Sequence, residues 1–351
     1  MVENPGVIDS CAIACTVCIA NYNGASIIVD CINSVLGQEG GPSTEIIIHD
    51  DASSDGSVEI IRQSFPADVY SQIRILESPA NVGFCISNNR MVAEARGDFI
   101  LLLNNDAVLD ANAIASLYQA AREQSRKGIL SLPQFDWGSG EIVDRGCLLD
   151  PFFNPVPNLD ATRSDVAMSI GACLWIPRHL WAQIGGFPAW FGSIAEDMLI
   201  CTQARLLNYP VQIVHESAYR HKQGASFGGN RAFPNGLSTT YRRRMLSERN
   251  KTFVMVICLP AWLLCSLLPL HVLVLLLEGA TLSTLKRDLR LWREVYWNAV
   301  KSLLTYRKEL AQQRNKIQSL REVSIRAFLS AFSAYPRKLT LLKKYGVPSV
   351  S

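Results

Sequence analysis

The sequence lacks the features that mark several classes of protein. Its 351 residues contain no internal repeat, which excludes solenoids and propellers. The first ten residues are polar and acidic, so no secretory signal peptide is predicted and we expect a reducing, cytoplasmic setting. The ten cysteines form no disulfide framework, because several lie inside apolar runs. Cys15 and Cys18 form a C-x-x-C pair, but on a strand their side chains point to opposite faces and cannot share a metal or a disulfide.

Each part of the chain is short of charges of one sign. Residues 1–239 carry 14 Lys/Arg against 25 Asp/Glu, whereas residues 240–351 carry 20 Lys/Arg against 6 Asp/Glu. We therefore predict an acidic globular domain, residues 1–239, followed by a basic, leucine-rich helical region, residues 240–351. A basic region of this kind is attracted to anionic surfaces, either phospholipid or nucleic acid.

Short apolar runs alternate with segments of helical periodicity from residue 15 to residue 126. This alternation predicts βαβ units and an α/β fold with a mostly parallel sheet flanked by helices. Residues 134–166 are rich in Gly, Pro, Asn and Asp and predict loops with short strands. Strands are predicted at 15–20, 45–48, 73–76, 99–103 and 166–176, with a last strand at 211–214, and helices at 25–36, 58–65, within 81–96, at 111–126, 178–184 and 194–207.

Acidic residues follow two of the predicted strands. Asp106 follows the apolar run of the segment FILLLNNDAVL, and ligands of open α/β sheets bind beside the carboxyl ends of such strands. Asn-Asn-Asp alone is also an ordinary turn. Asp50 and Asp51 follow the second strand, and two adjacent negative charges favour a functional role. Asp55 is at least as well explained as a helix cap.

A third acidic pair, Glu196 and Asp197, begins a predicted helix. Carboxylates in a first helical turn interact favourably with the helix dipole, which is the alternative explanation for this pair. Glycines and the aromatic pair Trp190-Phe191 precede it and suggest a shaped pocket wall. His221 follows in a polar loop, RHKQGAS, where it could complete a metal site of hard ligands.

Taken in order, these segments resemble the inverting family 2 glycosyltransferases, which have the Rossmann-like GT-A fold. The resemblance covers about residues 12 to 227, and seven segments in family order carry it. They are NYNG, HDDASSDGS, NVGFCISNNR, LLLNNDAV, GACLWIPRHLW…GGF, EDMLICTQARLLNYP and RHKQGAS.

The resemblance implies a site for a nucleotide sugar. Asp50 and Asp51 match the acidic pair that holds the nucleoside, and Asp197 matches the general base. The other positions that it assigns to the donor are Asn21, Asn81, Gly83, Asn88 and Asn105, and those that it assigns to the acceptor side are Glu196 and Trp190.

A divalent metal, Mg²⁺ or Mn²⁺, is implied as the cofactor. Asp106 matches the last carboxylate of the metal-binding DXD-type motif, and His221 matches a C-terminal histidine that can ligate the metal. Oxygen ligands suit such an ion, which neutralises the charge of a leaving diphosphate. Asn104 stands where a strict D-x-D motif has its first carboxylate, which weakens the metal argument without removing it.

The basic region contains an apolar stretch, residues 253–277, interrupted by Pro260, Pro269 and His271. Its length of about 25 residues is enough to cross a bilayer. Both flanks are basic and both therefore favour the cytoplasmic side, so we expect an interfacial or re-entrant helical hairpin kinked at the prolines rather than a single span. Two helices packed on the acidic domain are the other possibility. Aromatics among the basic residues are also typical of nucleic-acid binders, but no recognised motif supports that partner.

The leading hypothesis is an inverting hexosyl- or deoxyhexosyltransferase. The expected donor is a UDP-, dTDP- or GDP-linked sugar, and the expected acceptor is a lipid-linked or cell-surface polysaccharide glycan at the cytoplasmic face of the plasma membrane. An inactive scaffold of the same fold that binds a membrane complex is the alternative. A nucleotidyltransferase would be expected to have a glycine-rich, basic phosphate loop after the first strand, and NYNG lacks one.

Overall fold

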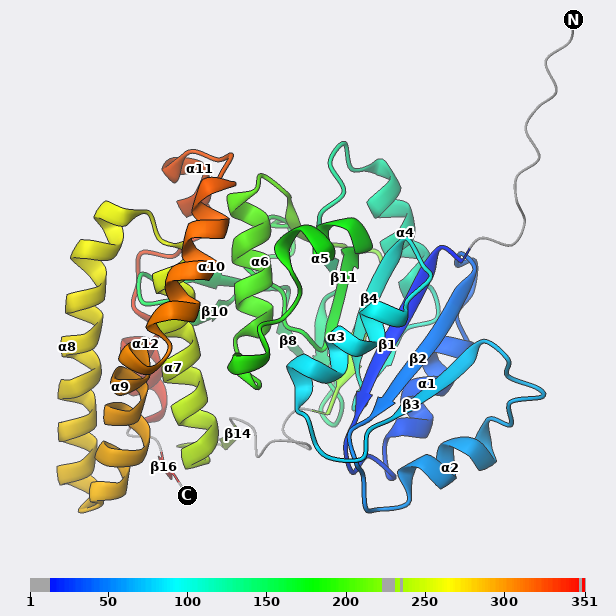
Figure 1. The fold of residues 1–351 in the computed structure, drawn as a ribbon, viewed down its shortest axis with the longest axis horizontal. Helices are drawn as coiled ribbons and strands as arrows, with labels where there is room; N and C mark the ends of the chain where they lie inside the picture. Colours follow the sequence, from blue (N-terminus) through cyan, green and yellow to red (C-terminus); the bar gives the residue numbers. More distant parts are fainter. Residues whose placement is uncertain (1–12, 223–230, 234–235, 347–348, 351) are drawn as a thin grey trace, which may run out of the picture.

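A seven-stranded, mostly parallel sheet lies at the centre of the molecule (Figure 1). The computed structural model describes residues 13–222, 231–233, 236–346 and 349–350. The strands of the sheet, in spatial order, are β12 (Val211–Ile213), β6 (Ile129–Ser131), β11 (Cys173–Pro177), β4 (Phe99–Asn104), β1 (Cys15–Asn21), β2 (Thr44–Asp50) and β3 (Ile73–Glu77). The predicted α/β class is confirmed.

Helices cover both faces of this sheet, as the uninterrupted apolar strands require. One face packs against α3 (Phe84–Glu94), α5 (Arg178–Ile184) and α6 (Glu196–Leu206). The other face packs against α1 (Ile28–Leu36), α2 (Ser57–Ser64) and α4 (Ala113–Glu123). Cys15 and Cys18 lie in these two separate clusters, which confirms that their side chains point to opposite faces of β1.

Two strand predictions were wrong. The strand expected at 166–176 begins only at Cys173, and it runs antiparallel to β4 and β6. Gly171 and Ala172 form a turn instead, and Gly171 donates its N–H to a side chain of α6. The strand at 211–214 is not the last one, because His221 lies in a further strand, β13 (Tyr219–His221), rather than in a loop.

β13 belongs to a second, four-stranded sheet in the order β5 (Ala107–Leu109), β13, β7 (Gln134–Asp136) and β8 (Ile142–Asp144). β5 directly follows β4, so this sheet brings His221 beside the end of β4. Residues 223–226 of the predicted RHKQGAS segment lie outside the described residues. The remaining strands are β9 (Cys147–Leu149), β10 (Pro155–Pro157), β14 (Arg231–Phe233), β15 (Gly236–Thr239) and β16 (Ser349–Val350).

The basic region is helical, as predicted. Its elements are α7 (Tyr241–Cys258), α8 (Ala261–Lys286), the π-helix η2 (Leu291–Trp297), α9 (Asn298–Thr305), α10 (Arg307–Ser319), α11 (Ile325–Leu329) and α12 (Arg337–Tyr345). A 3₁₀ turn, η1 (Ala189–Phe191), precedes α6. In Figure 1, α7 lies between α6 and α8, and α8 forms the edge of the molecule farthest from β3.

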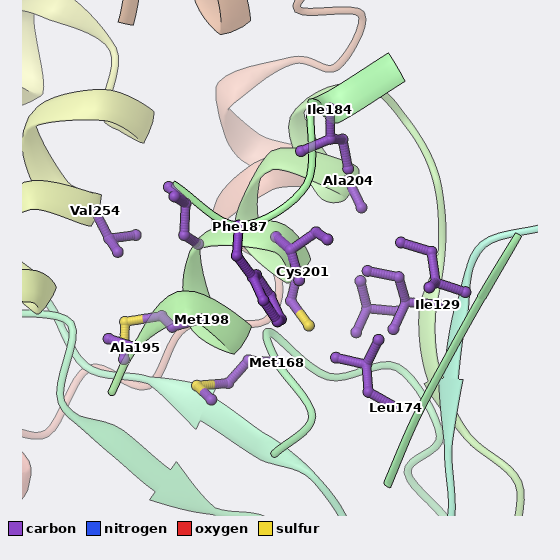
Figure 2. Close-up of a cluster of buried hydrophobic side chains, with 14 of the residues drawn as sticks. Ile129, Met168, Leu174, Ile184, Phe187, Ala195, Met198, Cys201, Ala204 and Val254 are labelled. Atoms are coloured by element: carbon purple, nitrogen blue, oxygen red, sulfur yellow. The ribbon is translucent and has the colours of Figure 1, made fainter. Parts of the chain in front are cut away.

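The apolar stretch 253–277 does not form one membrane hairpin. Pro260 separates it into two helices, because proline has no N–H to continue α7. Except for the half-buried Val256, the side chains of 253–258 are buried in the same core as α6, and Figure 2 shows Val254 and Met198 as members of this cluster. By contrast, only 17% of the most apolar part of α8 is buried, and this helix alone is long and apolar enough to span a bilayer among the described residues.

The hydrophobic core continues across residues 239 and 240. One cluster of buried side chains includes Leu199 of α6, Phe253 of α7, Leu310 of α10 and Phe328 of α11. The division at 239/240 therefore marks a change of charge and composition within one packed core.

Candidate active site

Three side chains at the carboxyl ends of β1, β2 and β4 form one buried hydrogen-bonded chain. Asn21 Nδ2 donates to Asp50 Oδ1 over 2.9 Å, and Asn105 Nδ2 donates to Asn21 Oδ1 over 2.9 Å. Asp50 also accepts from the N–H and the hydroxyl of Ser53. Gly24 lies against this chain so closely that a Cβ there would be 2.2 Å from Asn21 Oδ1. The sequence analysis assigned the three polar residues to the donor site but missed Gly24.

Asp51 holds the loop that precedes α3. Its two carboxylate oxygens accept from the N–H groups of Val82, at 2.7 Å, and Gly83, at 2.8 Å. Gly83 has a φ of +89°, a conformation that glycine adopts without strain. Asn81 is exposed beside this loop, whereas Asn88 is buried and donates to the carbonyl of Phe84 within α3. Of the donor residues predicted in this segment, Asn81 and Gly83 thus lie in the loop before α3, whereas Asn88 makes a contact within α3.

Asp106 and His221 meet behind the end of β4. His221 Nε2 lies 3.0 Å from Asp106 Oδ1 and 3.5 Å from Asn104 Nδ2. Both the carboxylate and the imidazole are buried, and His221 Nδ1 has no partner. Because Lys222 N–H also donates to the Asp106 carbonyl, β13 is fixed against this turn on both sides of the histidine.

Asp106 and His221 can supply two ligand atoms to a divalent ion. Within the described ranges, no group of three or more His, Cys, Asp and Glu side chains could hold a metal. A carboxylate oxygen and an imidazole nitrogen fit Mg²⁺ or Mn²⁺ chemically, provided that diphosphate oxygens and waters complete the coordination.

Glu196 and Asp197 lie in the first turn of α6. Asp197 Oδ2 accepts from Gly171 N–H over 2.9 Å, and Oδ1 accepts from Met198 N–H over 2.7 Å. Glu196 Oε2 is buried without a partner. Burial raises the pKa of Asp197 above its ordinary value, and it raises the pKa of Glu196 to about 8, with a further contribution from the Asp197 charge.

A cation of the basic region acts on this pair. The charge of Arg243, in the first turn of α7, lowers the pKa of both carboxyls and so opposes the effect of burial. The sequence analysis grouped Arg243 with the basic flank of the apolar stretch and missed this role. Trp190 is stacked on Tyr306 at 5.4 Å between ring centroids, and its predicted place on the acceptor side rests on the resemblance alone.

The two halves of the site adjoin through the turn that precedes β11. Asn104 N–H donates to the carbonyl of Ala172 over 3.0 Å, and the neighbouring Gly171 N–H donates to Asp197. Gly171 and Ala172, two residues of one tight turn, therefore separate the Asp197 carboxylate from the turn that contains Asp106. This edge of the sheet can bind a charged ligand on one side and accept a proton on the other.

Two curated relatives indicate the kind of protein to which the chain is similar. It is 29% identical over 109 residues to the glycosyltransferase GlyG of Streptococcus pneumoniae, covering 31% of this chain and 35% of that one. It is 26% identical over 161 residues to a poly(ribitol-phosphate) beta-glucosyltransferase of Bacillus spizizenii, covering 44% of this chain and 24% of that one. The chain thus matches about a third or less of the length of these relatives.

Solved structures share the fold across most of the chain. S. aureus TarS 1–349 in complex with UDP-GlcNAc superposes with a TM-score of 0.58 and 17% identity, covering 88% of this chain and 89% of that one. The mannosyltransferase PcManGT of Pyrobaculum calidifontis, in complex with GDP-Man and Mn²⁺, gives a TM-score of 0.50 at 16% identity, covering 92% and 88%.

Two family models match the sequence. The model of glycosyl transferase family 2 matches residues 16–174, and that of glycosyl transferase family group 2 matches residues 99–334, which is more than half of the chain. With this match and the shared GT-A fold, the chain belongs to glycosyl transferase family 2.

Proposed function

We propose that the protein transfers a hexosyl or deoxyhexosyl group from a nucleotide sugar, with inversion, to a hydroxyl of a lipid-linked or cell-surface polysaccharide. One observation carries this proposal: a half-buried carboxylate, Asp197, adjoins the turn of Asn104 and Asp106 through Gly171 and Ala172. A proton acceptor next to an anion-binding edge is what a single displacement requires. TarS, bound to UDP-GlcNAc, and the poly(ribitol-phosphate) glucosyltransferase support the donor and acceptor classes.

The donor's nucleoside would contact Asp50 and Asp51, under the loop that ends at Gly83. UDP, dTDP and GDP all present a ribose or deoxyribose hydroxyl and a base edge that carboxylates can accept hydrogen bonds from. Asp106 and His221 would hold Mg²⁺ or Mn²⁺, which supplies charge neutralisation for the diphosphate when bound. PcManGT, solved with GDP-Man and Mn²⁺, supports this assignment.

Asp197 would take the proton of the acceptor hydroxyl. As that oxygen bonds to the anomeric carbon, the bond from this carbon to the diphosphate oxygen breaks, and its electron pair leaves with the diphosphate. Attack from the face opposite the leaving group inverts the anomeric configuration. The N–H groups of Gly171 and Met198 fix the carboxylate in the orientation that this step needs.

We infer that the protein works at the cytoplasmic face of the plasma membrane, with α8 against the bilayer. One side of α8 is exposed and apolar, and its large side chains are Trp262, Leu270, Leu273, Leu277 and Leu285. Lys286 and Arg287 are exposed at its carboxyl end, where they would meet anionic headgroups. The opposite side of the helix packs on α7 and η2 through buried residues such as His271 and Leu275.

Transfer is tested by release of nucleoside diphosphate from a panel of UDP-, dTDP- and GDP-sugars, with Mn²⁺ and a lipid-linked acceptor. We expect release from at least one donor, and its loss in Asp197→Asn with donor binding retained. Turnover in that variant would assign the base elsewhere. Thermal stabilisation by nucleoside diphosphate without turnover of any donor would favour the inactive scaffold.

Membrane docking is tested by flotation with anionic phosphatidylglycerol vesicles. We expect the wild type to float and the pair Leu273→Glu with Leu277→Glu to remain in the soluble fraction. Val69→Glu is the matched control, because Val69 is also an exposed apolar residue (66%, against 52% for Leu273 and 58% for Leu277) but lies on the acidic domain. Flotation of the double variant at the wild-type level would contradict the assignment.

A further inference from the structure

The loop that leads into Glu196 and Asp197 has an unfavourable backbone. Gly192, Ile194 and Ala195 have φ values of +75°, +71° and +66°. Glycine adopts such values freely, but a β-branched isoleucine at positive φ is a genuine outlier. Two consecutive non-glycine residues in this region persist only where the surroundings hold them. The strained backbone ends one residue before the carboxylate pair.

Asn250 of α7 holds this loop. Its Nδ2 group lies within hydrogen-bond distance of three loop carbonyls, those of Phe191 at 3.1 Å, Ser193 at 2.9 Å and Ile194 at 2.7 Å. The asparagine has no exposed surface. A buried side-chain amide that faces three carbonyls of one loop constrains the backbone far more than a single contact would.

Arg249 fixes the orientation of that amide. Its Nε donates to Asn250 Oδ1 over 2.8 Å, so the amide oxygen faces the guanidinium and the NH₂ group faces the loop. Arg249 Nη2 also donates to the Phe191 carbonyl over 2.7 Å. The guanidinium itself lies over the rings of Phe253 and Tyr306, which keep it in place.

The same loop reaches the donor side. The carbonyl of Gly192 accepts from Cys85 N–H at 3.3 Å, in the first turn of α3. Asp51 independently holds Val82 and Gly83, immediately before α3. Release of the loop would therefore displace α6 and its carboxylates while leaving the donor loop anchored by Asp51.

We propose that Asn250, oriented by Arg249, is the positioning residue that holds the Phe191–Ala195 loop and thereby places Asp197 for proton transfer. The proposal rests on the proposed role of Asp197 as general base. It assigns to the helical region, outside the resemblance over residues 12–227, a direct part in the geometry of the reaction. Because a displacement of about 1 Å costs about a hundredfold in rate, the expected effect is on turnover.

The test compares Asn250→Ala with Thr252→Val in the full-length chain. Thr252 is a matched control on the other side of α7, where its hydroxyl bonds to the Glu248 carbonyl and to His271. For Asn250→Ala we expect kcat to fall about a hundredfold and the donor KM to stay within about twofold. For Thr252→Val we expect both constants to stay near wild type. Asn250→Ser retains one donor and replaces the alanine variant if that one does not fold.

Amide hydrogen exchange of the peptide over residues 189–198 supplies a readout that does not depend on catalysis. We expect exchange there to accelerate at least about tenfold in Asn250→Ala and not in Thr252→Val. Unchanged exchange, or a kcat equal to that of Thr252→Val, would overturn the proposal. If the wild type transfers no sugar, the proposed function fails, while the exchange comparison still decides whether Asn250 holds the loop.

Discussion

At the scale of residues, the two adjacent carboxyls of the candidate site differ in their hydrogen-bond partners. Asp197 has two backbone N–H donors, whereas the buried Oε2 of its neighbour Glu196 has none. A hydrogen bond to the charged form favours ionisation, and burial without a partner opposes it. The pair can therefore present one negative charge at neutral pH, on the residue proposed to accept the proton.

Glu196 should make stability depend on pH. Burial raises its pKa to about 8, far above the value near 4.5 expected when the chain is unfolded. The folded state thus favours the protonated carboxyl, and this stabilisation, complete below pH 4.5, is lost as the pH rises through 8. We expect Glu196→Gln to raise the melting temperature at pH 9 and to change it little at pH 4. Circular dichroism melts at both pH values would measure this, and an equal effect at both would contradict it.

Gly24 should be intolerant of any side chain. A Cβ would be 2.2 Å from Asn21 Oδ1 and 2.5 Å from Asn105 Nδ2, so Gly24→Ala must separate the hydrogen-bonded chain of the donor side. We expect the donor KM to rise at least about tenfold, the cost of roughly one buried hydrogen bond. Gly41→Ala is the control, because the atom nearest to its Cβ position is 3.6 Å away, an ordinary van der Waals contact. Equal donor KM values in the two variants would show that the hydrogen-bonded side chains of Asn21, Asp50 and Asn105 do not bind the donor.

The polar residues of the candidate site could be proposed from the sequence, whereas the residues that hold them could not. Asp51, Asp106 and Asp197 follow apolar segments or begin a helix, and both patterns can be recognised from the sequence alone. Gly171 and Asn250 could not be found in that way, because their roles depend on contacts with residues 26 and more positions away. Nothing in the local sequence of either residue signals such a contact.

At the scale of elements, strand direction and helix environment were the features that the sequence did not reveal. An apolar run has the same pattern in a parallel and an antiparallel strand, so the reversal of β11 could not be predicted. Likewise, hydropathy alone cannot separate residues 253–258, which protein atoms bury except at the half-buried Val256, from α8, which is largely exposed. The existence of the helices was nevertheless predicted correctly, and α5 has the predicted bounds.

Gly279 offers a test of how α8 packs. Alanine at an internal helix position ordinarily stabilises by about 1 kcal/mol relative to glycine. Here a Cβ would be 2.7 Å from Cβ and Cγ of Tyr296, so η2 would have to move. We expect Gly279→Ala to destabilise the protein by about 1–3 kcal/mol in urea unfolding, the usual cost of overpacking. A stabilised variant would mean that α8 and η2 are not packed in this register.

At the scale of the whole molecule, the acidic and basic parts share one core, and an ion network of the basic part contacts the acidic part. Glu248 of α7 pairs with Lys251 at 2.5 Å and with Lys338 of α12 at 2.7 Å, and Lys338 also pairs with Glu278 of α8. Lys251 donates in addition to Asn154, between β9 and β10. Removing one partner of such a network leaves a buried charge uncompensated, so these elements are expected to fold together.

Truncation should therefore abolish folding rather than release a stable domain. A chain of residues 1–239 would expose the apolar surface of α6 that Phe253, Val254 and Ile257 cover, each of which is fully buried. We expect this fragment to be insoluble or to lack a cooperative thermal transition. A soluble fragment with a sharp transition would establish 239/240 as a true domain boundary.

The distribution of thiols allows a fluorophore to be attached to α8. Among the described cysteines, Cys265 on α8 is exposed and the other eight are buried. Once Cys11, which lies outside the described residues, is replaced by serine, an environment-sensitive fluorophore would attach at a single position on the helix proposed to meet the bilayer. We expect a blue shift of its emission on addition of anionic vesicles, and no shift would leave α8 facing water. The native sequence thus already contains a labelling site with which membrane binding can be followed in real time.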